Sequence, residues 1–372
     1  MLPDLIALEL DGLGAVQVVH DGELSVLGAH DGHPWLDLVE IDHASPLCIP
    51  RTTVEETGAA VGQNPPAPRY FFPPRVLSCT RKGGFEITVS IGAPVGAPGA
   101  GLVTDLPWHF LDLGLPGLHV RSRGAGIRVA LLDSGVFAEE GLFANLRSLK
   151  PDGSPAENID SNGHGTLCAS LLASLDEEAP GVAPEVELDS FGVMVGGAPV
   201  DAMVRQALVT AVQRGCHVVS CSFTLFEADP STLDAVRMAC NQGVVVVAAS
   251  GNDPNVTADF PERTPNVLVV GPYGHDRELL TSRFGLFTDV LAPGIDLPAV
   301  ARDGSRTTFG QSSGATAVTA GVMALVLSIA RSRGTARVGL ALEALARTTA
   351  MQSGEARLLD PDRLLQAVLS LP

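Results

Sequence analysis

The chain has 372 residues, with 42 acidic and 24 basic side chains, a formal net charge of −18 at pH 7, and 45% apolar residues. This length allows two domains, or one large domain with an extension, and the apolar share suffices for a sizeable core. Because so acidic a surface repels phosphates, we expect no nucleic-acid partner.

The first hundred residues differ in pattern from the rest. Short alternating apolar runs predict strands of a small, mostly β module; they lie at 5–10, 15–19 and 85–89. A Pro- and Gly-rich stretch at 92–101 indicates a linker. The predicted division has three parts: an N-terminal module at 1–100, a linker leading onward at 101–125, and a second domain at 126–372.

The N-terminus and the longest apolar run indicate in which compartment the protein is expected. Residues 1–5 lack a basic segment followed by a long apolar one, so we expect no signal peptide and a cytoplasmic protein, with export by another route left open. The longest apolar run, 321–330, is too short to span a bilayer, so no membrane span is predicted.

From Gly126 onward, strands and helices alternate. The continuous apolar run at 127–132 is typical of a strand buried on both faces. Further strands are predicted at 186–188, 218–221, 244–249 and 267–270, and helices at 202–214, 233–241 and 314–330. This alternation predicts an α/β fold: a doubly wound, mostly parallel sheet with helices on both faces.

Chemistry-bearing side chains follow two of these strands. Asp133 comes directly after the strand at 127–132, and Asn252 lies just beyond the strand at 244–249. In such sheets ligands bind at the carboxyl ends of the strands. The pattern therefore predicts a site at this edge.

Three short segments carry a carboxylate, an imidazole and a hydroxyl. They read Leu-Leu-Asp-Ser-Gly at 131–135, Asn-Gly-His-Gly-Thr at 162–166, and Ser-Ser-Gly-Ala at 312–315. A serine hydroxyl becomes a strong nucleophile when a histidine takes its proton and a carboxylate orients that histidine. Asp133 and His164 are the candidates for the last two roles, and Ser312 or Ser313 for the first.

In the order Asp, His, Ser, these segments resemble the subtilisin-like serine proteases, the subtilases, from about residue 106 to the C-terminus. The resemblance implies a serine endopeptidase that works through an acyl-enzyme, with Asp133, His164 and Ser313 as the triad. It also implies Asn252 as a donor to the oxyanion. Gln311 stands where the family has glycine, and counting back from Gly321 selects Ser313 over Ser312.

The resemblance further implies a substrate cleft. In the family a strand that here contains Ser222, Phe223 and Thr224 pairs with an extended peptide and lines the S1 pocket, and Gly251 allows the substrate backbone to approach. Thr224 replaces a glycine of the family, which predicts a restricted pocket. Asp160 lies in a polar loop and is expected to shape this cleft.

No cofactor is implied for the chemistry, and structural calcium stays an open question. No metal-ligand cluster is visible in the sequence, and the six cysteines show no Cys-x-x-Cys spacing, so free thiols are expected. Cys168, four residues after His164, resembles the cysteine of proteinase K-type subtilases. It is either a thiol beneath the imidazole or a packing residue.

Three functions remain in competition at this stage. The leading hypothesis is a selective processing protease whose N-terminal module regulates it or recognises its substrate. The others are a broad degradative intracellular protease and, third, a peptide-binding pseudoprotease. For the module itself, a removable folding chaperone is the alternative to a permanent recognition domain.

Overall fold

The computed structural model describes residues 106–371, apart from 138, 158, 254, 256, 262–263, 280–286, 335–337 and 354–355, and the strand backbones between residues 4 and 92. It describes no side chain before residue 106 and none at 352–353. The Pro- and Gly-rich stretch, from 93 to 101, lies outside the described residues.

The chain divides into two compact units, Met1–Leu106 and Pro107–Pro372. The first unit contains a seven-stranded sheet. Within this sheet, β1 pairs antiparallel with β2 on one side and parallel with β9 on the other. In sheet order its strands are β7 (Cys48–Arg51), β6 (Leu38–Ile41), β3 (Leu24–Val26), β2 (Gly14–His20), β1 (Asp4–Leu10), β9 (Glu86–Gly92) and β8 (Arg75–Lys82). A separate short pair joins β4 (Ala29–His30) and β5 (His33–Pro34).

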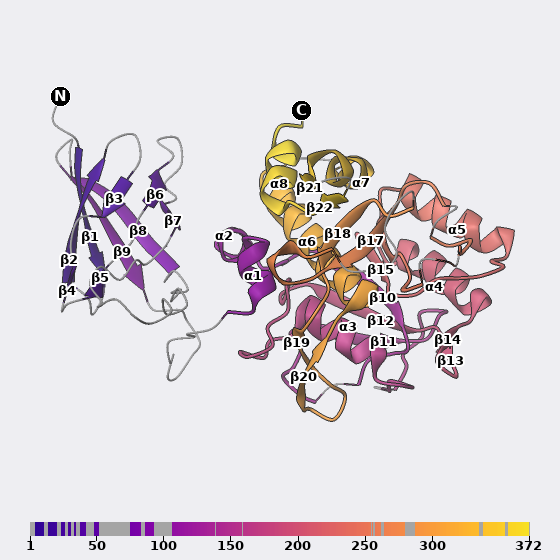
Figure 1. The fold of residues 1–372 in the computed structure, drawn as a ribbon. Helices are drawn as coiled ribbons and strands as arrows, with labels where there is room; N and C mark the ends of the chain where they lie inside the picture. The colour runs from indigo at the N-terminus through magenta and orange to yellow at the C-terminus, as the bar shows by residue number, and fades with distance from the viewer. Residues whose placement is uncertain are drawn as a thin grey trace. The chain divides into compact units, whose positions relative to one another are not determined.

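The second unit is built on a nine-stranded sheet that is parallel except at one edge, where β21 pairs antiparallel with β22 (Figure 1). In sheet order its strands are β11 (Leu146–Leu149), β12 (Glu187–Gly192), β10 (Arg128–Asp133), β15 (Val218–Cys221), β16 (Val245–Ala249), β17 (Val267–Tyr273), β18 (Val290–Pro293), β22 (Ala356–Leu358) and β21 (Met351–Ser353). The predicted doubly wound, mostly parallel α/β fold is confirmed.

Helices and two short ribbons complete this unit. The helices are α1 (Trp108–Asp112), α2 (Leu115–His119), α3 (His164–Ala173), α4 (Asp201–Gln213), α5 (Pro230–Asn241), α6 (Gln311–Ser332), α7 (Val338–Thr349) and α8 (Pro361–Leu369), with a 3₁₀ turn η1 (His275–Arg277). The ribbons pair β13 (Met194–Val195) with β14 (Ala198–Pro199), and β19 (Leu297–Val300) with β20 (Arg306–Phe309). The first two helices fall within residues 101–125, the segment predicted as the linker and entry to the second domain.

The core has two halves, one on each side of the sheet. Alternate strand residues such as Ala130 and Leu132 join a cluster with the buried faces of α4 and α5. The intervening residues point the other way, toward α6, because successive side chains of a strand alternate between faces. By length and composition α6 could cross a bilayer, but 94% of its most apolar 18-residue window is buried inside the protein. It is the central core helix.

The order of the strands positions the site. After β10 the chain adds β11 and β12 on one side, and it then crosses to add β15 and β16 on the other. The direction of winding therefore reverses beside β10. In open α/β sheets, the crevice at such a reversal lies outside the carboxyl ends of the strands and is where ligands bind. Asp133 is the last residue of β10.

The start of the second unit contains a buried, uncharged histidine. His109 on α1 is 0% exposed, and neither of its ring nitrogens has a hydrogen-bond partner among the described residues. Its ring packs edge-on against Trp108 and Phe110. Burial lowers the pKa of His109 to about 3, so the ring is neutral in the folded protein at any pH near neutrality.

We expect the fold to lose stability steeply in acid. The unfolded chain takes up a proton at His109 near pH 6.5, but the folded chain does so only near pH 3, so stability present above pH 6.5 is lost as the pH falls. The loss from this residue is roughly 3 kcal/mol at pH 4.5. The free energy of unfolding, measured in urea between pH 7 and 4.5, should depend much less on pH in His109→Leu than in the wild type. A variant whose unfolding free energy falls as steeply with decreasing pH as that of the wild type would contradict this.

Candidate active site

Asp133, His164 and Ser313 come from three separate elements and meet in one hydrogen-bonded row. The Nδ1 atom of His164 lies 2.7 Å from Oδ1 of Asp133, and the Nε2 atom lies 3.1 Å from Oγ of Ser313. With a proton on Nδ1, the imidazole donates to the carboxylate and accepts the serine proton at Nε2. This row can therefore activate the Ser313 hydroxyl as a nucleophile.

Glycines allow the first turn of α3 to pack this closely on the end of β10. Gly163, just before His164, has φ +91°, a left-handed conformation that favours glycine. A Cβ atom on Gly165 would lie 2.0 Å from the carbonyl oxygen of Gly135 and 3.2 Å from Cβ of Asp133. The Gly-His-Gly sequence is thus what lets His164 reach the carboxylate.

Ser313 lies in the first turn of α6, which begins at Gln311, three residues earlier than the sequence predicts. At this position the nucleophile is near the positive end of the helix dipole. Ser222, just after β15, donates its hydroxyl proton to the carbonyl oxygen of Ser313 over 3.0 Å. The Ser313 hydroxyl also lies 3.3 Å from the carbonyl oxygen of Ser222.

The surroundings of His164 favour its charged form. Burial lowers the pKa of the imidazole, but the hydrogen bond to the Asp133 carboxylate and the charge of that carboxylate outweigh burial and bring the pKa above its usual value. Burial raises the pKa of the Cys168 thiol, which is therefore neutral. Cys168 is fully buried, with its sulfur 3.8 Å from Nδ1. The structure thus places this thiol against the imidazole, and the four described cysteines are all free.

Ser312 and Asn252 form a second interaction beside the nucleophile. The side-chain oxygen of Asn252 accepts hydrogen bonds from the backbone N–H of Ser312, at 3.2 Å, and from its hydroxyl, at 2.7 Å. With its oxygen occupied in this way, Asn252 keeps its Nδ2 group as the donor available to a substrate. The two adjacent serines therefore face different partners: Ser313 the imidazole, and Ser312 the amide.

The segment predicted as a substrate-pairing strand, residues 222–224, lies just beyond the end of β15 and is not itself a strand. It packs against the loop that contains Phe260. Phe223 is 7% exposed and its ring packs against Phe260, at 6.0 Å between centroids. Leu225 donates its N–H to the carbonyl oxygen of Phe260 over 3.0 Å. Between them Thr224 is only half-buried. Gly251, next to Asn252, has φ +81°, again in the region that favours glycine.

The sequence did not predict that Phe309 and Asp160 lie close to His164. The ring of Phe309, at the end of β20, packs edge-on against the imidazole, with 5.4 Å between centroids. Asp160, which the sequence predicts to shape the substrate cleft from a polar loop, is only 5% exposed, and its carboxylate oxygens accept hydrogen bonds around the start of α3. An Asp followed by Ser-Asn-Gly is typical of an Asx turn, which could have predicted its hydrogen bonds to the next backbone N–H groups but not its burial.

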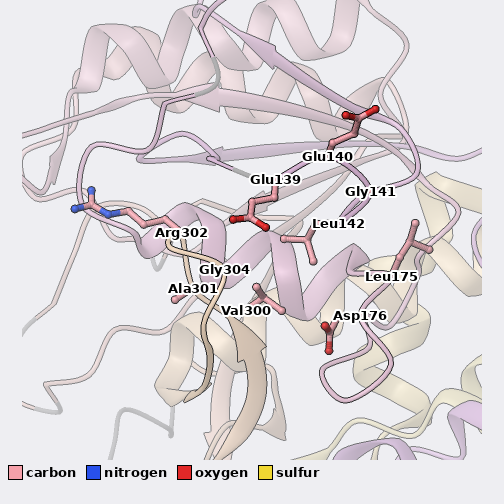
Figure 2. A pocket seen from close by; sticks show the side chains of 10 residues that line it. All are labelled: Glu139, Glu140, Gly141, Leu142, Leu175, Asp176, Val300, Ala301, Arg302 and Gly304. Atoms are coloured by element: carbon pink, nitrogen blue, oxygen red, sulfur yellow. The ribbon is translucent and has the colours of Figure 1, made fainter.

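A cavity of about 230 Å³ lies between the loop after β10, the loop after α3 and the β19–β20 hairpin. Figure 2 shows Leu142 and Val300 in the middle of its lining and Glu140, Asp176 and Arg302 at the edges. Asp176 is already paired with Arg306, at 3.0 Å. Arg302 also donates to the backbone carbonyl of Asp160, at 3.2 Å, which connects the cavity wall to the loop before His164.

Among the described residues, one group of His, Cys and acidic side chains has metal-ligand proximity, namely Asp133, His164 and Cys168, whose ligand atoms lie within 4.8 Å of one another. Asp133 Oδ1 and His164 Nδ1 are already in direct contact at 2.7 Å. The arrangement suits proton transfer along the row better than coordination of an ion.

The comparisons with known proteins agree with this fold. Residues 124–363 match the Subtilase family, Peptidase S8. Alkaline elastase YaB of Bacillus sp. (strain YaB) is 34% identical over 229 residues, which cover 59% of this chain and 60% of that protein. Subtilisin Savinase of Lederbergia lenta is 32% identical over 226 residues, covering 59% of this chain and 84% of that protein.

A solved structure shows the same fold. The prenylagaramide maturation protease PagA superposes with a TM-score of 0.62 at 24% identity, over 68% of this chain and 98% of that chain. The family match spans nearly two thirds of the chain and includes every residue of the row described above. This chain belongs to the subtilase family.

Proposed function

We propose that this protein is a serine endopeptidase and that Asp133, His164 and Ser313 are its catalytic triad. The observation that carries the proposal is the continuous hydrogen-bonded row from carboxylate to imidazole to hydroxyl. A scaffold that only binds peptides has no need for this alignment. The pseudoprotease alternative is therefore disfavoured.

In the proposed reaction, Ser313 Oγ attacks the carbonyl carbon of the scissile peptide bond and its proton passes to Nε2 of His164. Asp133 accepts the Nδ1–H bond and stabilises the imidazolium. Asn252 Nδ2 donates to the oxyanion. His164 then protonates the leaving amine, the C–N bond breaks, and a water molecule activated by His164 hydrolyses the acyl-enzyme.

Burst kinetics test this proposal. With an activated ester such as p-nitrophenyl acetate, the enzyme should release one equivalent of p-nitrophenol rapidly and then turn over slowly, because acylation precedes a slower hydrolysis. The burst should disappear after treatment with phenylmethylsulfonyl fluoride. Ester and peptide hydrolysis without a burst and without inhibition would argue against an acyl-enzyme.

Within this activity we infer that the enzyme is a selective processing protease rather than a broad degradative one. Its substrate is an extended peptide that pairs with the segment from Ser222 to Thr224 and passes over Gly251. The half-buried Thr224 side chain, at a position where the family has glycine, supports a narrowed S1 pocket. Narrowing restricts the residues that can occupy P1.

Thr224→Gly should widen the accepted P1 range. The wild type should prefer small or slender P1 residues, because a branched side chain removes pocket volume and even one methylene changes discrimination about tenfold or more. A peptide-library digest read by mass spectrometry measures the profile. Wild-type preference for Phe or Tyr at P1, or an unchanged profile in the variant, would contradict the assignment.

We propose that residues 1–100 act as a recognition or regulatory module. None of the proposed site residues lies in it, and it forms a compact unit of its own. Deleting residues 1–100 should leave a soluble enzyme that cleaves generic peptides at nearly the wild-type rate but discriminates less among protein substrates. A truncated chain that misfolds and is rescued by residues 1–100 added in trans would show a folding chaperone instead.

A further inference from the structure

Asp160 is a buried carboxylate beside the triad that takes no part in the proposed proton transfer. Its Oδ1 atom accepts hydrogen bonds from the Ser134 hydroxyl at 2.6 Å, and from the backbone N–H groups of Asn162 at 3.2 Å and Gly163 at 2.8 Å. Its Oδ2 atom accepts from the N–H of Thr166 at 2.8 Å and from the Thr166 hydroxyl at 2.6 Å. Both oxygens are fully used.

These partners stand on either side of the Asp133–His164 contact. Ser134 directly follows Asp133, and its hydroxyl oxygen also accepts the N–H of Gly165 at 2.9 Å. Thr166 lies two residues after His164 in the first turn of α3. The carboxylate of Asp160 therefore ties the end of β10 to the start of α3 next to the triad pair.

The backbone of Asp160 is fixed as well. It bridges to Gly135, and its carbonyl oxygen accepts the 3.2 Å hydrogen bond from Arg302, which lies in the turn between β19 and β20. The same hairpin carries Phe309, whose ring contacts the imidazole. Asp160 is thus tied to the end of β10, to the start of α3 and, through Arg302, to the β19–β20 hairpin.

The carboxylate is held in its charged form. Burial raises the pKa of Asp160, but hydrogen bonds from Ser134 and Thr166, together with backbone N–H donors, outweigh burial and leave the pKa below its usual value. A negative charge at the N-terminus of α3 is also favoured by the helix dipole. Asp160 is therefore an acceptor for all five donors at any pH at which a protease of this kind is assayed.

We propose that Asp160 is a positioning residue that holds the His164 imidazole against Asp133 by fixing the first turn of α3 to the end of β10. This inference rests on the proposed function of the triad. Both carboxylate oxygens of Asp160 are occupied by donors of the protein itself, so its effect should fall on the chemical step and on the protonation of His164 rather than on substrate binding.

Asp160→Asn tests the proposal with little change in shape. The amide of Asn has an NH₂ donor in place of one carboxylate oxygen. When this NH₂ group faces Thr166, it lies against the backbone N–H of Thr166, which is also a donor, so the hydrogen bond that holds the first turn of α3 is lost. We expect kcat to fall at least tenfold while KM stays within twofold. Rates are to be expressed per active site, titrated with a fluorophosphonate, so that a smaller folded fraction does not count as slower catalysis.

A matched pair of variants at Thr166 separates the hydrogen bond from packing. Thr166→Val keeps the shape and removes the hydroxyl, whereas Thr166→Ser keeps the hydroxyl. We expect Thr166→Val to lower kcat several-fold and Thr166→Ser to stay near the wild type. Asp152→Asn is the control for the charge change, because Asp152 accepts similar local hydrogen bonds from Ser154 but is exposed.

The pH profile gives a readout that a purely structural role would not move. Among the described residues, the titratable groups facing the imidazole are Asp133 and the buried Cys168 thiol, and the Asp133 carboxylate holds the His164 pKa above its usual value. If Asp160→Asn loosens the Asp133 contact, that pKa falls, so the acidic limb of kcat/KM should shift to lower pH by about half a unit or more. Thr166→Val should shift it in the same direction.

The proposal is overturned if Asp160→Asn has a wild-type kcat per titrated site, if its effect lies in KM, or if the acidic limb does not move. Loss of stability alone, with unchanged kcat per site, would show a purely structural role and also overturns it. A wild-type enzyme with no burst and no fluorophosphonate labelling would instead show that the proposed function fails. The two failures are thereby distinguished.

Discussion

Ser313→Ala should abolish peptide hydrolysis and leave the fold intact. The hydroxyl is needed only to form the acyl-enzyme, and loss of the equivalent serine in subtilisin costs on the order of 10⁶-fold in kcat. Ser313 is 8% exposed and its side chain is small, so removing one oxygen opens little space in the core. Turnover of a fluorogenic peptide and circular dichroism measure the two halves of this prediction.

Ser312→Ala is the matched control at the neighbouring position. It removes one hydrogen bond to Asn252, an interaction typically worth about 1 kcal/mol, so we expect a loss of about tenfold or less. If Ser312→Ala is the inactive variant and Ser313→Ala retains activity, the nucleophile has been assigned to the wrong serine. The structure makes the opposite prediction, because only Ser313 faces the imidazole.

Asn252→Ala should lower kcat by about 10²- to 10³-fold with little change in KM. The range is that measured for the oxyanion donor of subtilisin. The charge that this amide stabilises develops only in the transition state, so the ground-state complex loses little. Full progress curves at several substrate concentrations separate the two parameters.

Asn255 supplies the control for this loop. It is exposed three residues later and hydrogen-bonds locally to Asp253, so Asn255→Ala should keep a wild-type kcat. A loss in Asn252→Ala that lies wholly in KM would show that Asn252 binds substrate rather than the oxyanion. Equal losses in both variants would point to a general disturbance of the loop.

Much of the fold could be predicted because the central strands carry a strong local signal. The strand predicted at 218–221 matches β15, Val218–Cys221, at both ends. All four of its residues are apolar or small and are buried, as is typical of a central strand covered on both faces. The row of side chains could also be predicted, because Asp133 and His164 each lie where a strand ends or a helix begins. Their short glycine-containing motifs are specific.

Other parts carry no such signal. The edge strand β11 reads Leu-Arg-Ser-Leu, is only partly buried, and forms because β12 offers it backbone partners. Short strands such as β18 depend in the same way on tertiary pairing with β17. Asp160 could not be identified as buried because its partners Ser134 and Thr166 come from two elements that meet only in the folded chain.

Labelling with a fluorophosphonate, followed by digestion and peptide mapping, tests the central claim most directly. The reagent reacts with a serine hydroxyl only where a base activates it, so the account predicts one label per chain, on Ser313. Labelling should fall to background in His164→Ala, in which the 3.1 Å contact to the hydroxyl is lost. A label on Ser312, or undiminished labelling in His164→Ala, would contradict the proposed triad.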